Sequence, residues 1–123
     1  MMTKKKKLNL DELISKLAGF GVPILVFLVA CGATGLFGAA AMTTVLAALG
    51  GPVGMIGGVA VLSVSGLVIE AITQFGFDTV FKRVVLELYK KGETKESILE
   101  KINSYKISEN LKAKLRDSIE SVS

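Results

Sequence analysis

The pattern of hydrophobic and polar positions divides the chain into three parts. From Leu17 to Ile69 the sequence contains no Asp, Glu, Lys or Arg, whereas the segments on both sides mix apolar and charged residues. A helix needs about 20 consecutive apolar residues to cross the hydrocarbon core of a bilayer. The uncharged run is long enough for two such helices and a turn. The pattern therefore predicts an all-α, small integral membrane protein built on a glycine-rich transmembrane helical hairpin.

The hairpin has one strong internal boundary. Residues 50–52 read Gly-Gly-Pro, and glycine commonly ends a helix while proline begins the next one. We expect the hairpin to occupy residues 19–76 with its turn at 50–52. Its second arm, which ends at Ile69, would extend about 27 Å as a helix and could cross a bilayer.

The first arm, residues 21–49, leaves two interpretations open. As one helix from Pro23 it would reach about 43 Å, which exceeds a hydrocarbon core of about 30 Å, so it would have to tilt strongly. Alternatively it is broken at 31–35, where the sequence Cys-Gly-Ala-Thr-Gly weakens a helix. The arm would then contain one helix up to Ala30 and another from Leu36.

The N-terminal segment, residues 1–18, predicts a basic terminus followed by a short amphipathic helix over 8–18. Asn9 can cap this helix, and Asp11 and Glu12 suit the positive end of its dipole. Its apolar face consists of Leu10, Leu13, Ile14 and Leu17. We expect the helix to lie on the membrane surface and to lead into the first arm.

The C-terminal segment, residues 77–123, predicts a soluble helical tail. A helix over 78–91 is followed by one that Thr94 can cap and one that Ser108 can cap. The apolar positions at helical spacing are Val80, Phe81, Val84, Val85, Leu88, Ile98, Leu99, Ile102, Leu111, Leu115 and Ile119. Phe75, Phe77 and Phe81 are expected to cluster at the membrane end of this tail. Because such short helices are marginal alone, we expect them to fold on one another or on a partner.

The net charge of +4 is concentrated near the N-terminus, in Lys4, Lys5, Lys6 and Lys7. Beside a membrane segment, such a tract indicates contact with anionic lipid, and the positive-inside rule places both termini in the cytoplasm. We expect a location in the cell membrane, in a bacterium the inner membrane. The tract lacks the interleaved aromatic residues of a nucleic-acid-binding surface, so we expect no nucleic-acid partner.

Small residues at four-residue spacing are the pattern that most suggests a function. They form two strips, which consist of Gly50, Gly54, Gly58 and Gly66, and of Gly35, Ala39, Thr43, Ala47 and Gly51. In lipid, small residues let helix backbones approach closely and so drive association. The strips can pack the two arms of one hairpin together, or they can join neighbouring copies into an oligomer.

Catalytic and cofactor chemistry find little support in the sequence. The chain has no His and a single cysteine, Cys31, so the usual zinc and copper ligand sets and an intrachain disulfide are excluded. We expect no enzyme activity, no metal and no cofactor. Glu70 is the one carboxylate beside the apolar run, and it is expected to mark the membrane interface with Lys16 or Lys82 as its partner. Alternatively it lies within the bilayer as an ion or proton ligand.

In composition and glycine spacing, residues 19–72 resemble glycine-zipper pore formers, small membrane-active toxins, holins and helical bacteriocins, although no motif diagnostic of one family is present. The resemblance implies a membrane-permeabilising, toxin- or holin-like protein that acts on the lipid bilayer as a homo-oligomer. The alternative is a non-conducting membrane anchor or accessory subunit whose tail, residues 77–123, binds a partner protein. A secreted or lipidated form with Cys31 at its N-terminus, and a soluble form with a concealed hairpin, also stay open.

Overall fold

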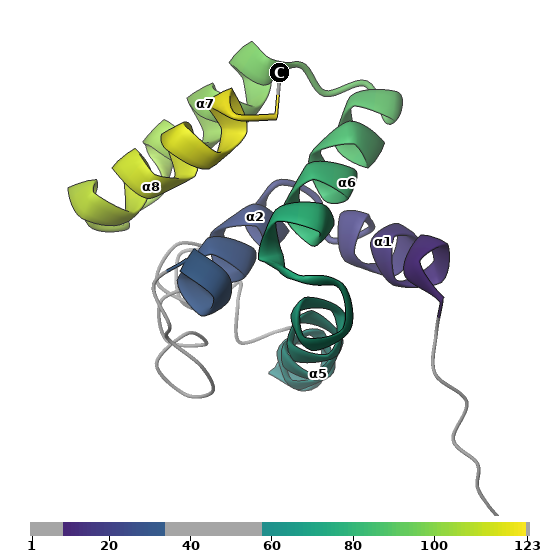
Figure 1. Ribbon diagram of the computed structural model, residues 1–123. Coiled ribbons are helices and arrows are strands. Elements are labelled where there is room, and N and C mark those ends of the chain that lie inside the picture. Colours follow the sequence, from purple (N-terminus) through teal and green to yellow (C-terminus); the bar gives the residue numbers. More distant parts are fainter. Residues whose placement is uncertain (1–8, 34–57, 123) are drawn as a thin grey trace, which may run out of the picture.

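The computed structural model describes residues 9–33 and 58–122, and within these ranges the chain is helical and contains no β-strand (Figure 1). The elements in chain order are α1 (Leu10–Ala18), α2 (Pro23–Leu28), the π-helix η1 (Val29–Ala33), α5 (Gly58–Phe75), α6 (Phe77–Lys90), α7 (Lys95–Ser104) and α8 (Glu109–Glu120). The expected all-α class is confirmed for these residues. The expected turn at 50–52 lies outside them.

The helices on either side of the apolar run begin where their capping residues predict. At the start of α1, Asn9 Oδ1 accepts the Glu12 N–H (2.8 Å) and Glu12 Oε1 accepts the Asn9 N–H (3.2 Å). Thr94 and Ser97 form the same reciprocal pair at the start of α7, with distances of 2.9 and 3.0 Å. Ser108 Oγ accepts the N–H three residues further along, at 3.1 Å, at the start of α8. These bonds satisfy N–H groups that a helix cannot satisfy itself.

The first apolar arm changes helix type instead of continuing as one α-helix. α2 begins at Pro23 as expected, but its α-helical geometry ends at Leu28, before the expected Ala30. The chain then continues as the wider π-helix η1 to Ala33. Such i→i+5 turns are rare, and they are found mainly as local interruptions of α-helices. The rest of the expected break, and the segment from Leu36, lie outside the described residues.

The second arm extends further than the charge pattern indicated. The expected span ended at Ile69, whereas α5 continues through Glu70 to Phe75. A glutamate is a good helix former and, on a partly exposed face, does not interrupt the helix. The chain turns instead at Gly76, whose φ of 86° lies in the left-handed region that glycine adopts readily, and α6 begins directly after it.

α6 occupies the middle of the bundle and contacts α1, α2 and α5. In Figure 1 it passes in front of α2, with α1 and α5 on its flanks and the α7–α8 pair on the other side. α8 contacts both η1 and α6, and one continuous apolar core joins all these elements. The apolar face of α1, expected on a membrane surface, is instead covered by α5 and α6. Helix contacts thus cross the expected segment boundaries at 18/19 and 76/77.

Candidate functional site

The most apolar element of the bundle is the continuous helical segment formed by α2 and η1. From Ile24 to Cys31 every side chain is at most 2 % exposed, and none of them is charged. Cys31 is a free cysteine at 0 % exposure. A helix that is apolar on all sides is either the core of a protein or a membrane span. In the described bundle this segment lies in the core.

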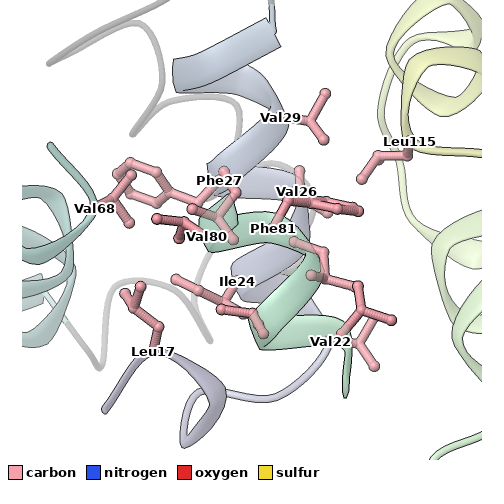
Figure 2. Close-up of a cluster of buried hydrophobic side chains, with 14 of the residues drawn as sticks. Leu17, Val22, Ile24, Val26, Phe27, Val29, Val68, Val80, Phe81 and Leu115 are labelled. Atoms are coloured by element: carbon pink, nitrogen blue, oxygen red, sulfur yellow. The ribbon is translucent and has the colours of Figure 1, made fainter. Parts of the chain in front are cut away.

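Side chains from the surrounding helices cover this segment, as Figure 2 shows. Leu17 of α1 lies near Ile24, and Val80 of α6 lies beside Phe27. On the opposite end, Leu115 of α8 points toward Val29 of η1, in agreement with the contact between these two elements. Amphipathic helices therefore act as a cover for an apolar one, and their polar faces meet the solvent in its place.

A close contact fixes η1 against the start of α6. A Cβ atom built on Gly32 would lie 2.2 Å from Cδ1 and 2.9 Å from Cγ of Phe77. No side chain fits there without moving the ring, so Gly32 permits the approach of the two elements. Phe77 in turn packs on Phe81, with ring centroids 5.4 Å apart. The sequence pattern indicates only a helix break at Gly32 and gives no sign of this contact, because Phe77 is far away along the chain.

The turn between α1 and α2 is exposed and rich in glycine. Gly21 has a φ of 81°, and Phe20 beside it is 42 % exposed. No single helix of the described residues is long and apolar enough to cross a membrane. Leu10–Ala18 and Pro23–Gly32 together have the length and composition, but they are bent by 119° at this turn.

The expected helix-packing residues are only partly described. Gly66 lies on the exposed face of α5, where an added Cβ would meet no atom within 4 Å, and Gly58 begins the same helix. The other members, which lie outside the described residues, are Gly35, Ala39, Thr43, Ala47, Gly50, Gly51 and Gly54. The same holds for Lys4, Lys5, Lys6 and Lys7. Self-association through the strips therefore stays a prediction.

Glu70 lies on α5 in a partly exposed position. Its Oε2 accepts a hydrogen bond from Gln74 Nε2, at 3.1 Å, one turn further along. Among the described residues it forms no ion pair with Lys16 or Lys82, which corrects that expectation. The partner comes from its own helix, because residues four apart share a face.

Ion pairs and polar contacts hold the α7–α8 region. Lys95 Nζ meets Glu120 Oε1 at 2.5 Å, and Lys101 Nζ meets Glu93 Oε2 at 2.6 Å. Hydrogen bonds from Lys101 and Ser97 lower the pKa of Glu93, and the bond to Glu120 raises the pKa of Lys95.

A further pair, Arg83 Nη2 with Asp11 Oδ1 at 2.6 Å, connects α6 to α1.

One side chain of α8 is a buried lysine. Lys112 is 9 % exposed and donates from Nζ to the backbone oxygen of Asn103 at 2.8 Å. That oxygen belongs to the last turn of α7, where carbonyl groups have no helical partner and the helix dipole is negative. Lys112 thus connects α8 to the C-terminal end of α7.

An open groove of about 470 Å³ lies between the start of α6 and the end of α8. Two phenylalanine rings and a valine form its apolar part, and charged and hydroxyl side chains line the rest. The lining residues are Phe77, Asp78, Phe81, Lys82, Ser118, Ser121 and Val122.

Within 9–33 and 58–122, no three His, Cys, Asp or Glu side chains are placed to hold a metal ion. The described residues thus form a helical bundle around an apolar helix. No protein-family model, no curated protein and no solved structure matches the chain.

Proposed function

We propose that this chain is a small membrane-permeabilising protein that inserts its uncharged segment into a bilayer and self-associates through its small residues. The observation that carries the proposal is the α2–η1 segment, in which all residues from Ile24 to Cys31 are apolar and buried. The core of a soluble bundle is ordinarily shared among half-apolar helix faces. This segment instead has the composition of a span and lacks only the length.

The exposed face of α5 supports the self-association part of the proposal. Gly66 is open to the solvent, with no atom within 4 Å of a built Cβ. Glycine in a helix interior costs about 0.5–1 kcal/mol relative to alanine, and here no contact of the described bundle requires it. A role in close helix association within lipid gives this glycine a physical reason.

The test uses dye release from vesicles of phosphatidylcholine and phosphatidylglycerol. The parent protein is expected to release the dye, and Gly66→Leu is expected to reduce the release to background, because leucine separates the helix backbones. Since position 66 is open in the bundle, Gly66→Leu keeps the parent's circular dichroism spectrum. Thr79→Leu, which adds the same side chain at an exposed position of α6, is the matched control and is expected to release dye like the parent.

Two outcomes contradict the proposal. Full release by Gly66→Leu excludes the glycine strip as the means of assembly. A parent protein that sediments with the vesicles but releases no dye excludes permeabilisation. The second outcome favours the membrane-anchor alternative, whose supporting observation is the groove between α6 and α8, because a partly apolar groove suits a protein partner.

A further inference from the structure

The bend between α1 and α2 separates two halves of a segment that could cross a membrane. Together the two helices have the length and composition of a membrane-spanning helix, but the 119° bend keeps them from forming one continuous helix. Residues 15–32 contain one charged side chain, Lys16, near their N-terminal end. As one helix they would extend about 27 Å, close to the thickness of the hydrocarbon core.

The bend depends on glycine and on packing against α6. Gly21 has a φ of 81°, which side-chain-bearing residues rarely adopt, whereas Gly19 has a helical φ of −62°. α1 is held against α6 by apolar contacts, and Asp11 pairs with Arg83 at its outer edge. Phe20, at the tip of the bend, is exposed and touches the solvent.

We propose that the turn at residues 19–22 is a hinge, and that α1 leaves α6 and joins α2 in one membrane-crossing helix over residues 15–32. This inference rests on the proposed function and names the segment that inserts first. In the bent form, α6 contacts α2, and α5 and α8 contact η1, so that the bundle keeps the protein in solution. In the straight form, the bilayer replaces that cover.

Pro23 stays inside the straightened helix, where it removes one hydrogen bond and produces a kink. Membrane helices tolerate such prolines, because side chains and local adjustments satisfy the freed carbonyl group. Lys16 lies close enough to the helix end for its ammonium group to reach the headgroups. The bent form is therefore the form for water, and the straight form is possible only in lipid.

Insertion is measured with a tryptophan at position 20, since the chain has no other tryptophan. Phe20→Trp replaces an exposed ring and leaves the core unchanged. Vesicles contain lipids brominated either near the headgroup or deep in the acyl chain. In a straight helix over 15–32, residue 20 lies about 5 Å from the midplane, so deep bromines are expected to quench the fluorescence more strongly than shallow ones. Stronger quenching by the shallow bromines would show surface binding and overturn the proposal.

A matched pair of glycine variants tests the hinge in the Phe20→Trp background. Gly21→Ala strains the bent form but not a straight helix, and is expected to speed insertion by about 5- to 30-fold. Gly19→Ala changes a residue that is already helical in the bent form, so this variant is expected to insert into the membrane at nearly the parent's rate. Equal rates for the two variants contradict a hinge at Gly21.

A cross-link between α1 and α6 tests whether α1 must leave. Asp11→Cys and Arg83→Cys are joined by a short bismaleimide in a Cys31→Ala background. The linked protein is expected to lose deep quenching, while the same unlinked variant retains it. Deep quenching that survives the link overturns the inference. Dye release is recorded in parallel: a protein that inserts deeply without releasing dye supports the hinge and contradicts only the permeabilising function.

Discussion

The central helical segment and the α7–α8 pair are built on opposite principles. α2 and η1 carry no charged side chain, and every residue from Ile24 to Cys31 is buried. α7 and α8 begin at hydrogen-bonded caps, expose most of their polar residues and are joined by the Lys95–Glu120 pair. The central segment is covered by other helices in the described bundle. The pair carries local signals that specify where each helix begins.

The two regions should also differ in how much their contacts contribute to the free energy of unfolding. Ion pairs between exposed side chains contribute about 0.2–1 kcal/mol, because water screens them. Truncating a buried apolar side chain costs several times more, since a cavity is left behind. The stability of the molecule should therefore depend mainly on the contacts around α2 and η1.

The largest expected effect is at the centre of α2. Phe27→Ala should lower the free energy of unfolding by about 3–5 kcal/mol, because Phe27 is fully packed. The matched control is Phe20→Ala, which removes an exposed ring a few residues away and should change it by less than about 0.5 kcal/mol. Urea unfolding followed by circular dichroism measures both. Similar losses for the two variants would show that α2 is not the centre of the core.

The contact between η1 and α6 should give the next largest effect. Gly32→Ala forces a methyl group into the Phe77 ring and should cost about 1–3 kcal/mol. Gly66→Ala, at the open position of α5, should instead stabilise the protein by about 0.5–1 kcal/mol. If the clash is the cause, Phe77→Ala should cancel most of the additional cost of Gly32→Ala in a double-mutant cycle.

A smaller effect is expected in the α7–α8 pair. Lys112→Met keeps the aliphatic length but removes the donor to the Asn103 carbonyl, and should cost about 1–2 kcal/mol. Lys114→Met, on the exposed side of the same helix, should be nearly neutral. Hydrogen exchange of the last turn of α7 should accelerate only in the first variant. An unchanged exchange pattern would argue against a capping role for Lys112.

The smallest expected effect is on the stability of the protein at acidic pH. Because the pKa of Glu93 is lowered in the folded protein, the unfolded chain binds the proton more readily, so this contribution to stability is complete above the ordinary pKa of 4.5. It is lost as the pH falls from there through the lower, folded value. Glu93→Gln should therefore flatten the pH dependence of unfolding in this window only. A parallel shift at all pH values would point to a different cause.

The sequence predicted individual helices well and their partners poorly. The starts of α1, α2, α7 and α8 follow from local signals, namely Asn9, Pro23, Thr94 and Ser108. The buried face of α6 also follows from its spacing. An apolar helix face predicts that the face is buried, but it does not show whether lipid or another helix buries it. The covering of α1 by α5 and α6 was therefore not foreseen.

The remaining differences have non-local causes. The fit of Gly32 against Phe77 joins two residues far apart in sequence, and helical spacing contains no such information. The charge pattern alone predicts that the second arm ends at Ile69, whereas α5 continues to Phe75 and the chain turns at Gly76. The hairpin turn, half of the first glycine strip and the whole of the second lie outside the described residues and stay predictions.

The buried position of Cys31 allows the opening of the bundle to be measured by thiol labelling. It is the chain's only thiol and lies inside the core, so a thiol reagent reaches it only during moments when the bundle separates. When reclosing is faster than reaction, the labelling rate divided by that of a free thiol equals the fraction of molecules open at any instant. This fraction should be compared in buffer and in the presence of vesicles. An unchanged fraction would show that lipid binds molecules that open spontaneously, and a larger one would show that lipid promotes the opening.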